Sequence, residues 1–251
     1  MQSKYKELKE ETFLANLEIP QRNLAIYTWG NVSGFDKNRG VFAIKPSGVP
    51  YDKLKTEDIV IIDLEGKKVE GELNPSSDTP THLEIYKAHP EIGGITHTHS
   101  PHATAWAQAM KSIPILGTTQ ADHLANAIIC SRYLSEKEVL NGYEKNTGIL
   151  IVETFQKPET GMDIAGAGAF PEDPLVFNEN PMILIGGHGP FSWGNSASNS
   201  VYNAAVLEEC ARMAWMVKTI NPDFTQLPDY IINKHYQRKH GKNAYYGQSK
   251  G

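Results

Sequence analysis

The chain has few cysteines, no long apolar run and no excess of positive charge. Its 251 residues include two cysteines, Cys130 and Cys210, which form no Cys-x-x-Cys pair. This count excludes a disulfide framework and is typical of free thiols in a reducing cytosol. Lys and Arg number 24 against 29 Asp and Glu, which gives a net charge of −5. A mildly acidic surface disfavours nucleic acid or an anionic membrane as partner, so any phosphate must be bound by a local site.

The sequence also shows no pattern typical of a membrane-spanning or secretory segment. The longest apolar runs, such as residues 59–62 and 182–185, are far shorter than a membrane span. Residues 1–11 are highly charged and lack the apolar stretch of a signal peptide. We therefore expect a cytoplasmic protein. No P-loop, Gly-x-Ser-x-Gly elbow or dinucleotide-binding fingerprint is present, so the sequence offers no support for those enzyme classes.

The hydrophobic pattern predicts a mixture of strands and helices without repeats or a linker, and hence a single domain over 1–251. Residues 30–34 form a predicted turn, 65–67 a hairpin turn, and 156–181 an exposed insertion loop rich in Gly and Pro. Ser196 or Ser198 is expected to cap the long helix near the C-terminus. Strands are predicted at 24–29, 41–44, 59–64, 148–154 and 182–185. Helices are predicted at 5–17, from a start signal at 74–80 to about 89–90, at 101–110 and at 199–220.

His97-Thr98-His99 is the most informative segment, and it follows the apolar run 92–96. On a strand, residues i and i+2 point to the same face, so two imidazoles would lean into one space. Neutral imidazoles placed in this way can bind one divalent metal. Two strand-end histidines facing solvent remain the alternative.

Two further residues are candidate ligands for the same metal. His188 follows an apolar strand and is flanked by Gly187 and Gly189, which allow a ligand to approach the backbone closely. Three histidines with an open position are the ligand set of a catalytic zinc. Asp78 would add a carboxylate oxygen. The alternatives are a turn histidine at 188 and a simple helix cap at 78.

Short segments of small residues are candidates for binding an anion. Ser76 and Ser77 stand directly before a predicted helix, where free N–H groups and the helix dipole favour negative charge. Ser47 and Gly48 form a similar small turn. Ordinary capping explains these residues equally well. The other candidates for the same pocket are Asn31 and Lys45, each of which could also be a surface residue.

Proton transfer has two weaker candidates. Asp122 lies in the polar segment 118–123 and offers a carboxylate. Tyr246, near the end of the chain, offers a phenol. Taken alone, both residues are better explained as solvated surface groups.

Together these segments resemble the class II aldolase family, in the order of the family and over nearly the whole chain. The matching pieces are TWGNVS at 28–33, IKPSGV at 44–49, PSSDTPTH at 75–82, THTHS at 96–100, GTTQAD at 117–122, HGPFSWG at 188–194, and KHY at 234–236 through YGQ at 246–248.

The resemblance implies an α/β fold: a three-layer α/β/α single domain around a mixed, largely antiparallel sheet. It implies a homotetramer whose active sites are shared between subunits, and Zn²⁺ or another divalent metal held by Asp78, His97, His99 and His188. Asp122 would act with Tyr246 of the neighbouring subunit as acid and base. The phosphate of the sugar substrate would be bound by Ser47, Gly48, Ser76 and Ser77, together with Asn31 and Lys45, and less certainly by His235 and Arg238.

Two departures from the family pattern, and the identity of one further residue, affect the functional interpretation. The segment 156–181 is longer than usual, and Gln120 stands where the family often has His. Asp78 stands where related aldolases have the Glu that serves as proton-transfer base. The resemblance therefore favours an epimerase that interconverts L-ribulose 5-phosphate and D-xylulose 5-phosphate by retro-aldol and aldol steps. The alternatives are an aldolase of a related sugar phosphate, and an adducin-like binding module without metal.

Overall fold

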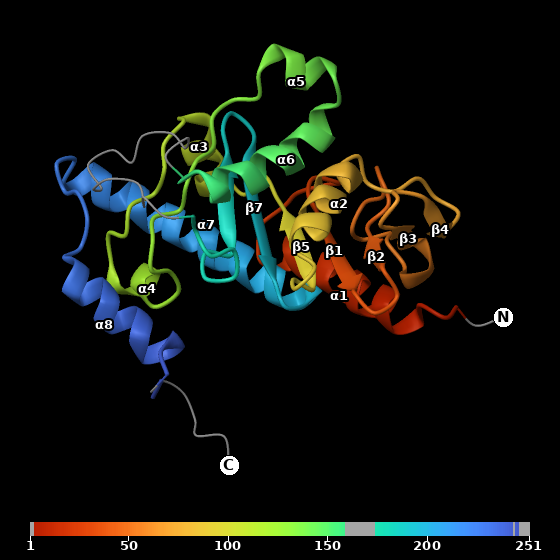
Figure 1. Ribbon diagram of the computed structural model, residues 1–251, viewed down its shortest axis with the longest axis horizontal. Coiled ribbons are helices and arrows are strands. Elements are labelled where there is room, and N and C mark those ends of the chain that lie inside the picture. The colour runs from red at the N-terminus through yellow and green to blue at the C-terminus, as the bar shows by residue number, and fades with distance from the viewer. Residues whose placement is uncertain (1–2, 159–173, 243, 246–251) are drawn as a thin grey trace.

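A seven-stranded sheet in the order β4-β3-β2-β1-β5-β7-β6 forms the centre of the computed structural model, which describes residues 3–158, 174–242, 244 and 245 (Figure 1). All six pairings among these strands are antiparallel, and one isolated parallel bridge joins Cys130 to Leu184. The sheet thus agrees with the predicted, largely antiparallel α/β fold. The strands are β1 (Asn31–Asp36), β2 (Val41–Ile44), β3 (Val60–Asp63), β4 (Lys68–Glu70), β5 (Gly94–His97), β6 (Met182–Ile185) and β7 (Gly189–Gly194).

Helices cover both faces of the sheet and complete three layers. On one face lie α1 (Lys6–Gln21), α3 (Pro101–Gln108) and α7 (Ala197–Ile220), and on the other lie α2 (Thr79–Ala88) and α6 (Tyr143–Gln156). Figure 1 shows α7 running along the long axis of the molecule behind the sheet. The shorter helices are η1 (Thr56–Asp58), α4 (Thr118–Ala121) and α5 (Glu136–Leu140), and α8 (Asp229–His240) lies near the C-terminus.

The alternation of side chains along β2 explains how the sheet fills two cores. Phe42 and Ile44 point into the core shared with α2 and α6, whereas Val41 and Ala43 point into the core beside α1. Successive strand residues face opposite sides, so four consecutive apolar residues indicate a strand that is covered on both faces. This reading of the sequence is confirmed, since β2 and β6 begin and end where predicted. The predicted cap is also present: Asn199 N donates to Ser196 Oγ at 3.1 Å.

The strand predicted at 24–29 is wrong. These residues form turns, Ile26 and Tyr27 are exposed, and Tyr27 has a φ of 55°. The strand begins instead at Asn31, inside the predicted turn at 30–34. The strand is not recognisable from the sequence because Asn31 and Ser33 are polar although they are buried. Asn31 hydrogen-bonds to Asp78 at the N-cap of α2, and Ser33 hydrogen-bonds to His82 within α2. A strand with this composition lacks the apolar alternation that sequence analysis detects.

The strand predicted at 148–154 is also wrong, because these residues lie within α6. A short apolar run does not distinguish a buried helix from a strand. The buried residues Thr147, Leu150, Ile151 and Thr154 follow helical spacing and pack α6 against the sheet and α2. Gly148 allows the two helices to approach closely, since a Cβ at this position would lie 2.7 Å from the carbonyl oxygen of Thr81.

The predicted insertion loop at 156–181 is only partly described. Gln156 is the last residue of α6, and residues 159–173 lie outside the described residues. Within 174–181, the prediction of an exposed loop is wrong at Phe177, which is buried and stacks on Trp193 with ring centroids 3.8 Å apart. Trp193 Nε1 donates to the carbonyl oxygen of Phe177 at 2.8 Å. This part of the segment therefore completes the core.

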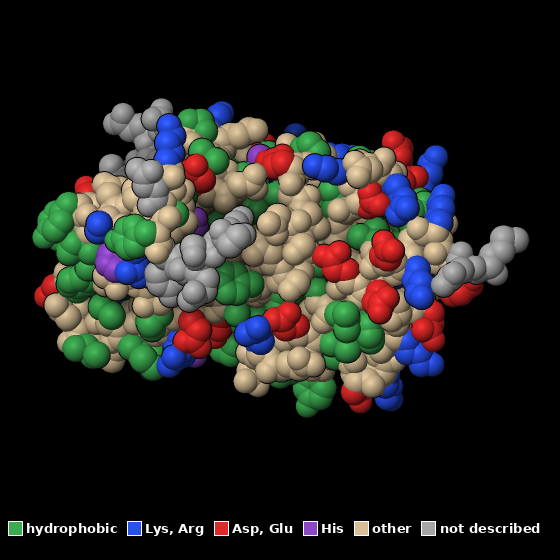
Figure 2. All heavy atoms as spheres, turned by 90° about the horizontal axis from the view of Figure 1, so that it is seen from below, with side chains coloured by type: hydrophobic (Ala, Val, Ile, Leu, Met, Phe, Trp, Pro, Cys, Tyr) green, Lys and Arg blue, Asp and Glu red, His purple; other side chains and the backbone are tan. Residues whose placement is uncertain are grey.

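The surface seen from below is mixed in character (Figure 2). Acidic and basic side chains are interspersed at the end of the molecule where the N-terminus lies, and apolar side chains are frequent at the opposite end. Large exposed apolar residues of α7 and α8 include Trp215, Ile220 and Tyr230. Among the described helices, none has both the length and the apolar character needed to cross a membrane.

Candidate active site

His97 and His99 lie side by side where β5 ends. His97 is the last residue of the strand, and its Nδ1 atom lies 2.9 Å from the carbonyl oxygen of Pro190 on β7. That carbonyl accepts a proton from Nδ1, so the lone pair of His97 is on Nε2. The Nε2 atoms of His97 and His99 are 3.2 Å apart. The two imidazoles therefore share one space, as the His-x-His spacing predicts.

His188 approaches the same space from the turn between β6 and β7. Its backbone N–H donates to the carbonyl oxygen of Ile185, and Gly187 has a φ of 73°, which suits glycine far better than other residues. The ring centroid lies 4.8 Å from that of His97 and 5.0 Å from that of His99. One ligand atom from each of the three histidines lies within 4.8 Å of the others, close enough to hold one metal ion.

Asp78 occupies the N-cap position of α2 without capping it, because its side chain accepts no hydrogen bond from the first turn of the helix. Its Oδ2 atom instead accepts from Asn31 Nδ2 at 2.7 Å. Burial would raise the pKa of Asp78, but the nearby His97 and His82 and the bond from Asn31 hold it below its usual value. The side chain is therefore an oriented carboxylate rather than a simple cap.

Burial also keeps the histidines in the form that binds metals. Desolvation, followed by repulsion from His97, lowers the pKa of His99 to about 4. Desolvation and repulsion from His97 and His99 lower the pKa of His188 to about 4. Both imidazoles are thus neutral at pH 7, and a neutral imidazole offers a lone pair to a metal.

The residues present fit a divalent metal such as zinc. The three imidazole nitrogens that lie within 4.8 Å of one another form a donor set that zinc accepts. Asp78 lines the same cavity but is not part of this three-histidine group. Two buried polar atoms beside this group, Asn31 Oδ1 and His82 Nε2, have no hydrogen-bond partner within the described chain. His82 was not identified from the sequence, where it reads as an ordinary helix residue. Its Nδ1 atom lies 2.6 Å from Ser33 Oγ.

A cavity of about 580 Å³ opens beside the three histidines and is lined by six of the predicted substrate-binding residues. The two weaker candidates, His235 and Arg238, do not line it and contact Asp122 instead. The loops that contain Ser47 and Ser76 form part of the cavity wall. Two backbone hydrogen bonds of 3.0 Å join these loops: Ser47 N donates to the carbonyl oxygen of Asn74, and Ser76 N donates to that of Lys45. Burial lowers the pKa of Lys45 to about 8. The predicted residues that line the cavity are Asn31, Lys45, Ser47, Gly48, Ser76, Ser77, Asp78, His97, His99 and His188.

Tyr143 and Glu144 line the same cavity and were missed from the sequence. Both belong to the first turn of α6, in a stretch where sequence analysis predicts no site. Tyr143 Oη lies 3.2 Å from His188 Nδ1, although 45 residues separate them. No local pattern signals this contact, which depends on the packing of α6 against the sheet.

Asp122 lies in a different cluster and does not line the histidine cavity. Its carboxylate accepts from Arg238 Nε at 2.8 Å and from Arg238 Nη2, and its Oδ1 atom lies 2.9 Å from His235 Nδ1. Burial would raise its pKa, but the bonds from Arg238 and His235 hold it below the usual value. Tyr246 lies outside the described residues.

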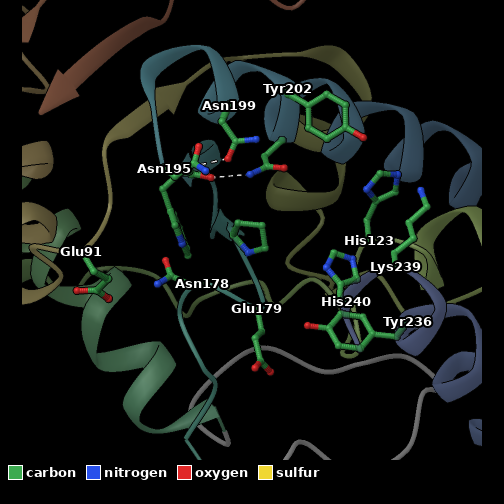
Figure 3. Close-up of a pocket in the computed structure, with 14 residues that line it drawn as sticks. Glu91, His123, Asn178, Glu179, Asn195, Asn199, Tyr202, Tyr236, Lys239 and His240 are labelled. Carbon is green, nitrogen blue, oxygen red and sulfur yellow. Dashed lines mark hydrogen bonds between the residues drawn. The ribbon is translucent and has the colours of Figure 1, made fainter. Parts of the chain in front are cut away.

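A second cavity, of about 520 Å³, lies beside the Asp122 cluster (Figure 3). His123, Lys239 and His240 stand together on one side of it, and Glu91 stands on the opposite side. His240 Nε2 lies 3.0 Å from the carbonyl oxygen of Asp122, which ties this wall to the cluster. The linings of the two cavities share no residue.

Comparison with known proteins identifies the class that this fold and site define. The family model described as Class II Aldolase and Adducin N-terminal domain matches residues 10–215, and the chain belongs to this family. Among curated proteins, it is 50% identical over 241 residues to L-ribulose-5-phosphate 4-epimerase UlaF of Salmonella paratyphi A and of Salmonella typhi. The matched region covers 96% of this chain and 98% of each relative.

Solved structures confirm the fold. A structure named L-fuculose 1-phosphate aldolase superposes with a TM-score of 0.73 at 24% identity, covering 95% of this chain and 97% of that one. A putative aldolase/epimerase/decarboxylase, YgbL from Escherichia coli, gives 0.69 at 20% identity, covering 92% and 99%. At these identities the likeness extends to the fold alone.

Proposed function

We propose that this chain is a cytoplasmic epimerase that interconverts L-ribulose 5-phosphate and D-xylulose 5-phosphate with the help of a divalent metal, most simply Zn²⁺. The observation that carries the proposal is the single cavity that joins three histidines and Asp78 to the Ser47 and Ser76 loops. Such a cavity has a metal end and an anion end. The names of the relatives at 50% identity support the substrate. The two free, buried cysteines suit a reducing compartment.

The chemistry of the substrate favours a route through carbon–carbon cleavage. The hydrogen on C4 is not acidic, because no carbonyl is adjacent to that carbon, so its direct removal and return is a poor route. Cleavage between C3 and C4 leaves an enediolate of dihydroxyacetone and glycolaldehyde phosphate. When the aldehyde turns its other face and the bond forms again, the configuration at C4 is inverted. The metal, when bound, supplies Lewis-acid polarisation of the keto and hydroxyl oxygens.

The residues of the cavity divide this work. His97, His99 and His188 would hold the metal, Asp78 of the same cavity would be the fourth ligand, and Asn31 orients Asp78. The backbone and hydroxyl groups of Ser47, Gly48, Ser76 and Ser77 would bind the phosphate, close to the start of α2, where the helix dipole favours an anion. Binding at this remote group keeps the aldehyde in place between cleavage and bond formation. Retention of the aldehyde separates an epimerase from an aldolase.

The acid and base belong to a site shared between subunits in this proposal. The described part of the cavity does not include Asp122, which stands with α8 beside another cavity. Because its pKa is lowered, Asp122 is a carboxylate at neutral pH. It would therefore first accept a proton as the base and then donate that proton as the acid. Asp122 of one subunit and Tyr246 of the next would flank the reacting aldehyde in a homotetramer. The exposed apolar residues Trp215, Ile220 and Tyr230 support association between copies.

The identity of the products tests the proposal. Purified protein given L-ribulose 5-phosphate should produce D-xylulose 5-phosphate, detected by a coupled enzyme specific for that ketose. Free dihydroxyacetone should not accumulate, because the aldehyde is retained. Accumulation of dihydroxyacetone and glycolaldehyde phosphate would identify an aldolase instead. Failure to turn over any ketose phosphate, combined with failure to bind metal, would point to a binding module.

A further inference from the structure

The phenol oxygen of Tyr143 lies within hydrogen-bond distance of one ring nitrogen of His188, Nδ1, which leaves Nε2 as the other possible ligand atom. We infer that Tyr143 is a positioning residue, whose phenol oxygen holds Nδ1–H of His188 so that Nε2 of this ring is presented to the metal. The inference rests on the proposed function, because it assumes a metal bound by His97, His99 and His188. The 3.2 Å distance between Tyr143 Oη and His188 Nδ1 is the main support for this inference.

His188 needs such a partner more than His97 does. His97 belongs to a strand, and the carbonyl oxygen of Pro190 fixes its ring through Nδ1 at 2.9 Å. His188 belongs to a turn, where no strand pairing restrains the side chain. A ligating imidazole is oriented by the group that binds its other nitrogen, and that group also selects the tautomer. Tyr143 occupies this place for His188, as the backbone carbonyl does for His97.

The start of α6 is built to hold Tyr143 in place. Asn146 Nδ2 donates to the carbonyl oxygen of Glu138 at 2.7 Å, which ties the first turn of α6 to α5. Thr81 Oγ1 donates to the carbonyl oxygen of Glu144 at 2.6 Å, which ties it to α2. Gly148 lets α6 approach α2 closely, and the two helices lie side by side in Figure 1.

Helix α2 is linked both to Asp78 and to the backbone beside Tyr143, which lie on two sides of the proposed metal site. Asp78 stands directly before α2, and the Thr81 hydroxyl of α2 fixes the backbone beside Tyr143. Packing between α2 and α6 therefore sets the carboxylate and the phenol relative to each other. The sequence alone does not reveal this link, since residues 78 and 143 are far apart along the chain.

Zinc affinity of the Tyr143→Phe variant tests the inference without relying on turnover. Zinc is titrated against a chromophoric chelator with metal-free wild type and metal-free variant. We expect the variant to bind zinc about 10- to 100-fold more weakly, the usual cost of losing the partner of a ligating histidine. Metal-free thermal unfolding should be unchanged, whereas the rise in Tm produced by added zinc should be smaller.

Tyr133→Phe is the matched control. The ring of Tyr133 packs over Gly187 on the same turn, and the change likewise removes one phenol oxygen. Zinc affinity should stay at the wild-type value in this variant. Equal zinc affinity of Tyr143→Phe and wild type would overturn the inference and leave the proposed function intact. Absence of zinc binding by the wild type itself would overturn both.

Discussion

The side chains of Asn31 and Asp78 are joined by a 2.7 Å hydrogen bond between β1 and the start of α2. Asn31 also donates to Ser76 Oγ at 3.1 Å, so one amide orients both a carboxylate of the metal end and a hydroxyl of the anion end. All three residues line the histidine cavity, and Asn31 is almost completely buried.

Replacing Asn31 by Ala should therefore weaken both ends of the site at once. The carboxylate of Asp78 would lose its orienting donor, so zinc affinity should fall by about 10-fold or more. KM for the sugar phosphate should rise as well, because the hydroxyl of Ser76 loses the same partner. Chelator competition and steady-state kinetics measure the two effects. Asn38→Ala, on an exposed turn, is the control and should change neither value.

Phosphate recognition predicts strong discrimination between phosphorylated and free sugar. Unphosphorylated L-ribulose should have a far lower kcat/KM than L-ribulose 5-phosphate, because remote binding positions the reacting centre. Ser76→Ala combined with Ser77→Ala should narrow this difference by lowering only the value for the phosphorylated sugar. Ser198→Ala, on an exposed turn of α7, should leave both values unchanged. Equal kcat/KM values for the two sugars in wild type would show that these serines do not bind the phosphate and serve only in turns and capping.

A shared active site predicts complementation between two inactive variants. Asp122→Asn and Tyr246→Phe should each be nearly inactive as pure proteins. When equal amounts are dissociated and reassembled together, about a quarter of the sites should contain both native residues by random assortment. Recovery of activity near that fraction supports the shared site. If subunit exchange is demonstrated and activity stays at the level of the variants, the two residues do not act together across an interface.

Acid should destabilise the metal-free protein, and His82 should account for part of the effect. Complete burial lowers the pKa of His82 to about 3, against an ordinary value near 6.5. Between these values the unfolded chain binds the proton and the folded chain does not, so stability falls as pH falls from 6.5 toward 3. One such group contributes up to about 1.4 kcal/mol per pH unit. Urea unfolding at several pH values measures this slope.

His82→Gln is the variant for that measurement, since it removes the titrating ring while keeping a polar group near Ser33 Oγ. Its free energy of unfolding should depend less steeply on pH than that of wild type. His99 and His188 contribute to the slope in both proteins, so the difference between the slopes reports His82 together with its effect on Asp78. Identical slopes in the two proteins would show that His82 is not held neutral by the fold.

Prediction from sequence succeeded where a local pattern reflects the final environment. Residues 41–44 and 182–185 are apolar throughout because both faces of their strands are covered, and they were assigned correctly. The His-x-His pair lies side by side as predicted, although β5 ends at His97 and His99 follows in the loop. In these segments the residue types along the chain are enough to predict the observed structure.

Prediction failed where tertiary contacts decide. Asn31 and Ser33 belong to a buried strand only because α2 supplies hydrogen-bond partners. Residues 148–154 form a helix because α2 offers a surface that Gly148 lets them approach. Tyr143 was missed for the same reason, since its contact with His188 depends on where α6 packs. The role and position of Asp122 relative to a neighbouring copy stay predictions.

Metal removal is the direct test of whether turnover depends on a metal held by His97, His99, His188 and Asp78. Turnover of L-ribulose 5-phosphate should be measured on purified protein, on the same sample after treatment with a chelator and gel filtration, and after adding zinc back. We expect turnover to be lost when the metal is removed and to return when stoichiometric zinc is added. Full turnover by protein shown to be metal-free by elemental analysis would contradict this expectation.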